Sequence, residues 1–183
     1  MSGSAAPPHS LVSGEVAAAL CAKAAATPPG AFVEVGVYHG GTAWHLARLA
    51  ETQGRRLYLY DTFTGIPYRC DRDSHAVGDF HDVDLTRVAL DVGYGTFVPG
   101  IFPASALDMG PIAFVHLDCD QFQSYRDALE YFEPRMIEGG VIWCDDMPAL
   151  QSAADAINEF VARGTCKLAM AEKAYLTFEG RRS

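Results

Sequence analysis

The chain alternates between short apolar runs and segments in which apolar residues recur at the spacing of a helix. The Ala-rich segment 11–26 favours a helix, and Thr27-Pro28-Pro29-Gly30 ends it and turns the chain. Short apolar runs bounded by turn residues predict buried strands. These strands are expected at 31–37, 57–60, 112–117 and 141–144, with two more at about 166–171 and 174–179.

Helices are predicted between these strands, where the apolar residues form one stripe. They are expected after Gly40-Gly41 up to Gly54, at about 84–90, at about 124–133, and from Pro148 to Gly164. Ser124 and Asp127 fit a capping box for the third of them. Buried strands that alternate with amphipathic helices are typical of a parallel sheet covered on both faces, so the predicted fold class is a doubly wound α/β fold.

The domain organisation follows from local composition. Residues 1–10 are rich in Ser, Ala and Pro and are expected to be a disordered tail, whereas 11–183 form a single domain. The segment 62–91 interrupts the pattern with Gly, Pro, His and Asp residues, which predicts a lid or binding loop above the sheet. The tail lacks the Lys or Arg of a signal peptide, and no apolar stretch approaches the roughly 20 residues of a spanning helix, so we expect a cytoplasmic protein with no membrane partner.

Charge narrows the choice of partner. The chain has 14 Lys and Arg against 23 Asp and Glu, a formal net charge of −9. An acidic surface repels phosphate backbones, so nucleic acid is disfavoured and a small molecule is favoured. The five cysteines show no CxxC spacing and predict reduced thiols, in agreement with a cytosolic location.

Acidic residues follow the predicted strands at their carboxyl ends. They are Asp61, Asp118, Asp120, Asp145 and Asp146. Ligands of open α/β sheets bind beyond this edge, where the strand order reverses. Any one of these residues could simply cap a helix, but their joint placement points to a functional site.

A glycine turn follows the first strand, over Glu34-Val-Gly36-Val-Tyr-His-Gly40-Gly41-Thr42. Gly36 lets the backbone approach a ligand, and the helix after Gly41 offers free amides to a carboxylate or phosphate. Asp61 ends the next strand, near the position where an acid that binds a ribose diol is expected. The turn is not GxGxxG, but together these residues suggest an adenosine-containing cofactor.

Six ordered blocks of residues carry a family resemblance. They are Glu34-x-Gly36-x-x-x-Gly40-Gly41, Asp61-Thr62-Phe63-x-Gly65-Ile66-Pro67, Gly78-Asp79-Phe80, Gly100-x-Phe102-Pro103, Leu117-Asp118-x-Asp120 followed by Ser124, and Gly139-Gly140-Val141-Ile142-x-x-Asp145-Asp146. In order and approximate spacing they resemble the TylF-type (macrocin O-methyltransferase) family. The resemblance covers about 32–147 and is far more specific than any single block.

The resemblance implies a class I methyltransferase with a Rossmann-like, mostly parallel seven-stranded sheet, S-adenosylmethionine (SAM) as cofactor and a divalent metal, usually Mg²⁺. Such an enzyme methylates a hydroxyl of a small molecule, here a sugar or a natural-product diol. The cofactor-binding residues it implies are Glu34, Gly36, Val37, Tyr38, Gly41, Thr42, Asp61, Thr62, Gly100 and Ile101. The implied metal ligands are Asp118, Asp145 and Asp146, and Asp118 would also accept the proton of the hydroxyl. A cation would relieve the repulsion among these carboxylates.

Departures from the family pattern concern the acceptor and the assembly. Phe122 stands where the family has Tyr, and Met147 stands where its usual DDY has Tyr. Few residues precede the first predicted helix, where the family has a long extension that helps to enclose the acceptor and build the oligomer. The identity of the acceptor is therefore not predicted, and a homodimer stays open.

Two other functions stay open at this point. The acid pairs 118/120 and 145/146 could belong to a Mg²⁺-dependent phosphatase-like hydrolase with an aspartyl-phosphate intermediate. Such a hydrolase would have Thr or Val soon after its second Asp, where this chain has Gln121-Phe122. The chain could also be a non-catalytic SAM-binding module, although the retained metal carboxylates argue against it.

Other conspicuous residues have simpler interpretations. His116 lies inside an apolar strand and is predicted to be a hydrogen-bonded core residue. Trp44 and Trp143 are assigned to the core. His39 in the glycine turn, or a histidine of the segment 62–91, could reach a substrate.

Overall fold

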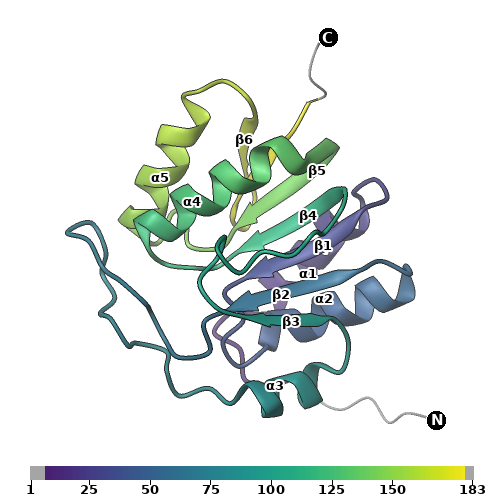
Figure 1. Cartoon of the computed structure of the whole chain (residues 1–183). Coiled ribbons are helices and arrows are strands. Elements are labelled where there is room, and N and C mark those ends of the chain that lie inside the picture. The colour runs from purple at the N-terminus through teal and green to yellow at the C-terminus, as the bar shows by residue number, and fades with distance from the viewer. Residues whose placement is uncertain (1–6, 180–183) are drawn as a thin grey trace.

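One seven-stranded sheet organises the computed structural model, which describes residues 7–179 (Figure 1). The strands are β1 (Ala31–Val35), β2 (Leu57–Asp61), β3 (Thr96–Pro99), β4 (Ile112–Leu117), β5 (Met136–Cys144), β6 (Lys167–Met170) and β7 (Ala174–Thr177). The helices are α1 (Gly14–Ala25), α2 (Gly41–Thr52), α3 (Leu85–Val92), α4 (Phe122–Phe132) and α5 (Gln151–Val161), with a 3₁₀ turn at Glu133–Arg135.

The strand order β3-β2-β1-β4-β5-β7-β6 confirms the predicted doubly wound fold. Strands β1 to β5 pair in parallel, and β7 runs antiparallel to both β5 and β6. The chain moves outward from β1 to β3 on one side and then from β4 onward on the other, so the order reverses between β1 and β4. Ligands of open α/β sheets bind beyond the carboxyl ends of the strands at such a point.

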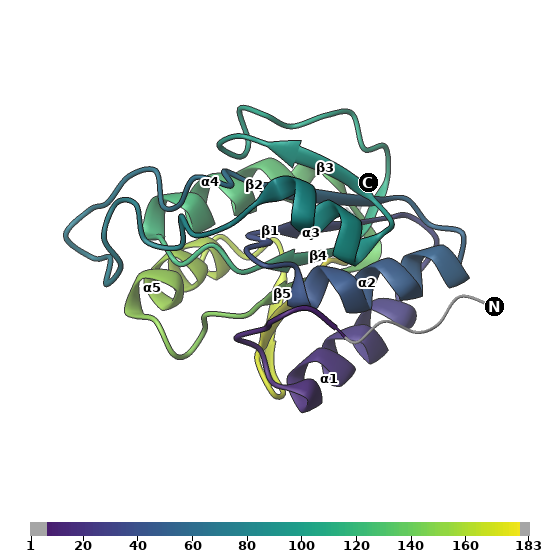
Figure 2. The ribbon, with the colours of Figure 1, turned by 90° about the horizontal axis from the view of Figure 1, so that it is seen from below.

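Helices cover both faces of the sheet because successive strand residues point to opposite sides. One set of buried residues, including Val115 and Ile142, packs with Leu129 of α4 and Ile157 of α5. The alternate residues, such as Phe114, pack with α1 and α2. Figure 2 shows α1 and α2 on the side of the sheet away from α4. Burial on both faces explains why β1 and β4 are almost entirely apolar, each with one buried polar residue, Glu34 in β1 and His116 in β4.

Several edges of the elements differ from the predictions. α5 begins at Gln151 and not at Pro148, and β5 begins at Met136 and not at Val141. β3 was not predicted, because it has four residues between Gly95 and Gly100 and buries only Val98. The predicted capping box at Ser124 is wrong. Helix α4 begins earlier, at Phe122, and a side chain from outside the helix accepts the hydrogen bond of that first amide.

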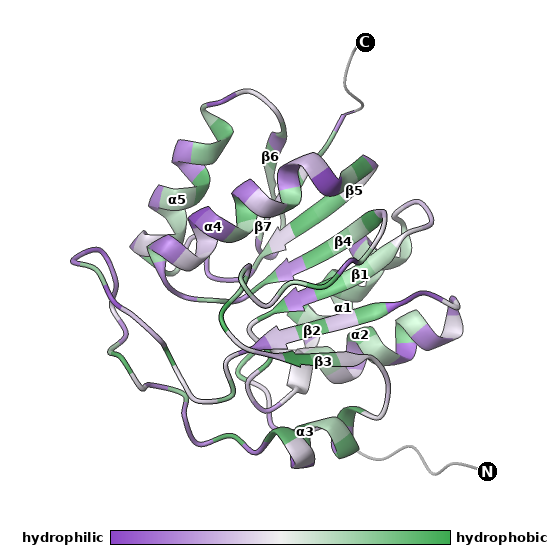
Figure 3. Cartoon of the chain, in the orientation of Figure 1, coloured by the Kyte–Doolittle hydropathy of each residue, from purple (hydrophilic) through white to green (hydrophobic). Residues whose placement is uncertain are grey.

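The segment between β2 and α3 extends beyond the carboxyl ends of the strands (Figure 1). We call residues 62–84 of it the lid segment. Figure 3 shows apolar strand interiors and hydrophilic residues at the arrowheads, which point toward the side of the molecule where this segment lies. The predicted tail divides in two: residues 7–10 are described and run near α2, and residues 1–6 lie outside the described part. None of the helices within 7–179 has the length and apolar character needed to cross a membrane.

Candidate active site

A cavity of about 510 Å³ opens at the carboxyl ends of β1, β2, β4 and β5. Every residue that the sequence assigns to a cofactor or metal lines it: Glu34, Gly36, Val37, Tyr38, Gly41, Thr42, Asp61, Thr62, Gly100, Ile101, Asp118, Asp145 and Asp146. The lid segment and the N-terminal residues 9–12 complete the wall. The fold therefore gathers distant parts of the chain around one space.

The glycine turn between β1 and α2 forms part of this wall. Gly36 has a φ of 93°, and a Cβ there would lie 1.7 Å from the carbonyl oxygen of Asp118. Only glycine fits this close contact between two backbone segments. Gly36 therefore has a packing role in addition to the predicted role of letting the backbone approach a ligand. Helix α2 begins at Gly41 without a side-chain cap from the described residues, and Gly41 and Thr42 line the cavity. The first amides of α2 are thus available to a ligand.

Asp61, at the end of β2, binds the backbone of two loops. Its Oδ2 accepts hydrogen bonds from the amides of Val37 (2.7 Å) and Tyr38 (2.9 Å), and its Oδ1 accepts one from the amide of Phe63 (2.8 Å). The Thr62 hydroxyl also lies 3.5 Å from Asp61 Oδ1, but it donates over a shorter distance to the Gly65 carbonyl (2.7 Å). A carboxylate has about four acceptor positions, so the fourth is left for a ligand hydroxyl. Asp61 therefore fixes the glycine turn, whatever it does for a cofactor.

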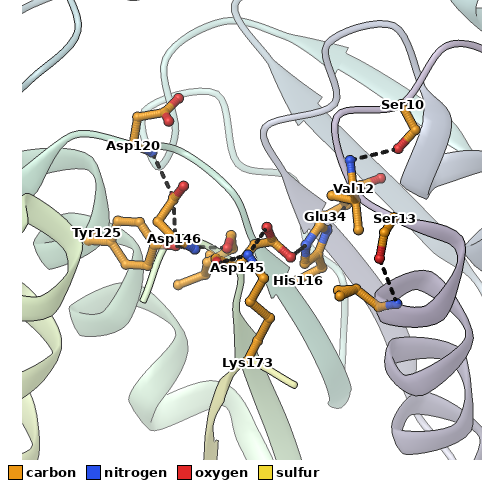
Figure 4. Close-up of polar contacts among 12 residues, drawn as sticks. Ser10, Val12, Ser13, Glu34, His116, Asp120, Tyr125, Asp145, Asp146 and Lys173 are labelled. Atoms are coloured by element: carbon orange, nitrogen blue, oxygen red, sulfur yellow. Dashed lines mark hydrogen bonds and ion pairs between the residues drawn. The ribbon is translucent and has the colours of Figure 1, made fainter. Parts of the chain in front are cut away.

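Three carboxylates meet beside the glycine turn. Oxygen atoms of Asp118, Asp120 and Asp146 lie within 4.8 Å of one another, and we call these residues the carboxylate cluster. Asp146 Oδ2 accepts from the Asp120 amide (3.0 Å) and lies 2.8 Å from the Tyr125 hydroxyl of α4 (Figure 4). Burial and the neighbouring Asp146 raise the pKa of Asp118 well above its ordinary value, and the same two causes raise the pKa of Asp120 to about 7. The cluster thus offers crowded oxygen donors of the kind that hard divalent cations bind.

Asp120 adopts a left-handed backbone with φ 58°, which is uncommon for a residue with a side chain. Its amide donates to Asp146, and its carbonyl accepts from the Ser152 hydroxyl at the start of α5 (2.6 Å). The next side chain, that of Gln121, donates to the carbonyl of Tyr68 in the lid segment (3.0 Å). Strained residues persist where their surroundings hold them and cluster at functional sites.

Asp145 lies outside this cluster, which differs from the metal set that the sequence predicts. The Asp145 amide donates to the Leu117 carbonyl (2.8 Å), so β-type pairing continues to this residue and successive side chains alternate in direction. Asp146 contacts α4, whereas Asp145 Oδ2 lies 2.9 Å from Lys173 Nζ. Burial alone would raise the pKa of Asp145, but His116 and Lys173 outweigh it and lower the pKa to about 2.

His116 is fully buried in β4 and hydrogen-bonded, as the sequence predicts for a core histidine. Its Nδ1 lies 2.8 Å from Glu34 Oε1, and its Nε2 lies 3.7 Å from Asp145 Oδ1. Burial would lower the pKa of His116, but its contacts with Asp145 and Glu34 raise the pKa to about 10. A row of basic and acidic side chains therefore lies beside the cavity (Figure 4): the partly exposed Lys173 and the buried Asp145, His116 and Glu34.

The lid segment is attached to the start of α4. Asp73 is 4% exposed, and its Oδ1 accepts from the Phe122 amide (2.7 Å) while its Oδ2 accepts from the Cys70 amide (2.7 Å). The Tyr68 hydroxyl pairs with the Ser124 hydroxyl (2.9 Å). A carboxylate at a helix N-terminus satisfies a free amide, so Asp73 takes the role of the missing cap.

Aromatic rings of the lid segment face the glycine turn. Phe80 lies 5.4 Å from Tyr38 and 5.0 Å from His75, measured between ring centroids. The Tyr38 hydroxyl donates to Asp82 (3.0 Å), and His75 Nε2 lies 3.6 Å from Asp120 Oδ1. The lid segment thus reaches both the glycine turn and the carboxylate cluster.

Comparison with known proteins assigns the chain to a family. The model of the family described as Macrocin-O-methyltransferase (TylF) matches residues 15–172. The chain belongs to this family. It is 32% identical over 156 residues to the 8-demethyl-8-(2,3-dimethoxy-alpha-L-rhamnosyl)-tetracenomycin-C 4'-O-methyltransferase of Streptomyces olivaceus. It is 26% identical over 162 residues to the demethyldecarbamoylnovobiocin O-methyltransferase of Streptomyces niveus.

Each of these two alignments covers 74% of this chain and 59% of the relative, so the chain spans less than two thirds of the relatives' length. The solved structure of the O-methyltransferase NovP shares the fold, with a TM-score of 0.74 and 20% identity over 91% of this chain and 79% of that chain. The TylF-type resemblance is thus confirmed. Because the chain belongs to a methyltransferase family, the phosphatase-like alternative is no longer supported.

Some contacts of this cavity were not predicted from the sequence. Asp120 was counted among the strand-end acids but was not grouped with Asp118 and Asp146, beside which it lies. The alternation of side chains along a strand is the signal that separates Asp145 from Asp146. No local pattern marks Lys173 in the turn of the last hairpin. Only the antiparallel pairing of β7 with β5 brings it beside Asp145.

Proposed function

We propose that the chain transfers the methyl group of SAM to a hydroxyl of a small molecule in a reaction that needs a divalent metal. The observation that carries this proposal is a single cavity lined by the glycine turn, Asp61 and the carboxylate cluster. A methyl donor and an acceptor oxygen held in one cavity can be aligned for direct transfer, and such alignment lowers the barrier strongly.

The cofactor would occupy the side of the cavity formed by β1, β2 and the loop after β3. Glu34, Gly36 and Thr42 would hold the methionine part, with its carboxylate at the first amides of α2. Asp61 would accept from a ribose hydroxyl at its remaining position. Gly100 and Ile101 would flank the adenine ring, to which the 44% exposed Ile101 side chain offers apolar surface.

The carboxylate cluster would hold the metal. Its three donors are hard oxygens, which suit Mg²⁺, Ca²⁺ or Mn²⁺ better than zinc. A cation would offset the burial and the repulsion from Asp146 that raise the pKa of Asp118 and Asp120. When bound, the metal would polarise the acceptor hydroxyl and lower its pKa. Asp145 is a metal ligand according to the family resemblance, but we propose that it keeps its contacts with Lys173 and His116 and does not bind the metal.

A carboxylate of the same cluster would also accept the proton of the acceptor hydroxyl. The sequence assigns this step to Asp118, and the geometry favours Asp120, because its side chain is 20% exposed and contacts His75 of the lid segment, which offers the proton a route to solvent. SAM, when bound, would supply the methyl group: the bond from the methyl carbon to sulfur would break as the C–O bond forms, leaving a neutral thioether. The hydroxyl proton would pass to the Asp120 carboxylate.

The acceptor is proposed to be a sugar of a glycosylated natural product or a related diol. The names of the two relatives support this class, since one specifies a rhamnosyl-bearing tetracenomycin and the other demethyldecarbamoylnovobiocin. The aromatic rings of Tyr38, Phe80 and His75 form a surface on which a sugar ring could pack. Two neighbouring hydroxyls could reach the carboxylate cluster from there.

The test is turnover by the purified protein. SAM, Mg²⁺ and a panel of small glycosides and catechols are incubated with it, and S-adenosylhomocysteine (SAH) and methylated product are followed by mass spectrometry. Methylation of a panel member supports the proposal. Tight binding of SAH without any turnover across the panel would instead support the non-catalytic SAM-binding module.

Two predictions concern the protein as a whole. A homodimer is tested by light scattering on the purified protein. A cytoplasmic location is tested by fractionation of the producing cell, and the free state of all five cysteines agrees with it.

A further inference from the structure

The row of basic and acidic side chains, partly exposed at Lys173 and buried at its other members, links the last hairpin to the glycine-turn side of the cavity (Figure 4). Lys173 Nζ donates to the Asp145 carbonyl (2.6 Å) and to Asp145 Oδ2 (2.9 Å). Asp145 Oδ1 lies 3.7 Å from His116 Nε2, a charge contact in which neither atom has a hydrogen-bond partner within residues 7–179. His116 Nδ1 lies 2.8 Å from Glu34 Oε1, within hydrogen-bond distance. The row thus begins at a cation in the hairpin turn and ends at a residue that lines the cavity.

The sheet fixes the positions of all members of the row. Glu34 pairs with His116 in the register of β1 and β4. Cys144 pairs with Ala174 in the antiparallel register of β5 and β7, so the next residues outward, Asp145 and Lys173, lie opposite each other. Rigid strands therefore present these side chains to one another, and the row is a built feature of the fold.

The free end of the row points to a ligand. Glu34 is 1% exposed and lines the cavity, and its Oε2 has no hydrogen-bond partner within residues 7–179. A buried carboxylate oxygen without a donor is costly, so a bound group that donates hydrogen bonds would stabilise it. A primary ammonium is such a group.

We propose that Lys173 and His116 are positioning residues for the cofactor, because they hold Glu34 where its Oε2 meets the amino group of the cofactor's methionine part. Lys173 compensates the buried charge of Asp145. The hydrogen bond to Glu34 orients the imidazole of His116, and the charge of Asp145 attracts it from the other side at 3.7 Å. Without Lys173, the Asp145 carboxylate draws His116 toward itself and away from Glu34. This inference rests on the proposed use of SAM.

The experiment compares two ligands that differ at the end contacted by Glu34. SAH carries the methionine-derived amino acid part, and methylthioadenosine lacks it. Both are titrated by calorimetry, without added metal, into the full chain and its Lys173→Met and Lys173→Arg variants. Lys167→Met is the matched control, because Lys167 is an exposed cation of the same hairpin that pairs with Glu179.

The expected result is selective. Lys173→Met weakens SAH binding about tenfold, the lower end of what the loss of an outer-shell partner typically costs in a metal site. Methylthioadenosine binding stays unchanged in that variant. Lys173→Arg keeps the cation and restores most of the SAH affinity, and Lys167→Met binds both ligands as the wild type does. Mn²⁺ binding, measured by electron paramagnetic resonance, is the same in all four proteins.

Either of two results would overturn this inference and leave the proposed function standing. The first is SAH affinity in Lys173→Met equal to that of the wild type. The second is an equal loss of affinity for SAH and methylthioadenosine, which indicates general damage to the site. If Lys173→Met does not fold by circular dichroism, Lys173→Gln, which keeps a donor without the charge, takes its place under the same criteria. A wild-type protein that binds methylthioadenosine or SAH with no measurable affinity overturns the proposed function and the inference with it.

Discussion

Asp145 and Asp146 are neighbours in the chain, yet their carboxylates bind different partners on opposite sides of the sheet. Asp145 contacts Lys173 and His116, whereas Asp146 contacts Tyr125 of α4. Because side chains alternate along an extended chain, one Asp-Asp pair serves two networks at once. One network is the row that runs from Lys173 to Glu34, and the other is the carboxylate cluster.

The first prediction separates the two members of this pair. Asp120→Asn and Asp146→Asn are expected to weaken Mn²⁺ binding by more than about 100-fold, since even outer-shell changes cost about 10–100-fold. Asp145→Asn is expected to leave Mn²⁺ affinity nearly unchanged, because its carboxylate faces Lys173. Electron paramagnetic resonance measures the affinities. A loss in Asp145→Asn as large as in Asp120→Asn would restore the metal set predicted from the sequence.

The second prediction concerns Asp61. Asp61→Ala removes the acceptor of three backbone amides and of a ribose hydroxyl, so SAH binding should weaken by about 1.5 to 3 kcal/mol, the value of a hydrogen bond to a charged group. Asp61→Asn keeps one acceptor oxygen and should lose less. Calorimetry measures both. Equal SAH affinity in Asp61→Ala and wild type would remove Asp61 from the cofactor site.

The third prediction concerns the lid segment. SAH should slow hydrogen exchange across residues 62–84, and Asp73→Ala should speed it, because Asp73 caps α4 from the lid segment. The lost cap should also lower the free energy of unfolding by about 1 kcal/mol. Asp71→Ala, at an exposed position of the same segment, is the control. Exchange in Asp73→Ala that matches the control would show that the contact with α4 does not hold the lid segment.

The fourth prediction concerns the N-terminal residues that line the cavity. A Cβ on Gly41 would lie 2.3 Å from the Cβ of Ser10, so Gly41→Ala should displace residues 9–12. The Val12 amide, which donates to Ser10 Oγ (3.1 Å), should then exchange faster with solvent. Gly14→Ala, where a Cβ meets nothing within 4 Å, is the control. Unchanged exchange at Val12 in Gly41→Ala would show that residues 9–12 do not rest on α2.

Much of this fold could be predicted from the sequence because burial on both faces leaves a strong local pattern. The run 112–117 coincides with β4, and the strand-end acids fall where the parallel sheet gathers them. β3 could not be predicted, because an edge strand with one buried residue carries little of that pattern. The start of α4 was missed because its cap, Asp73, comes from a segment distant in sequence.

The sequence predicts which residues line the cavity, but it does not predict which of them contact one another. The sequence places Asp118, Asp145 and Asp146 at the right edge, but it does not show that Lys173 lies opposite Asp145. That contact depends on β7 inserting antiparallel beside β5. Pairing between distant strands is set by the whole fold, so no local motif records it.

The central claim is metal-dependent methyl transfer to a hydroxyl, and one measurement tests it most directly. Purified protein is stripped with a chelator and incubated with SAM and a diol-bearing glycoside, with and without restored Mg²⁺, and SAH and methylated product are quantified by mass spectrometry. The account predicts that both products form together when Mg²⁺ is restored and that neither forms in chelator. Equal yields of methylated product with and without Mg²⁺ would contradict it.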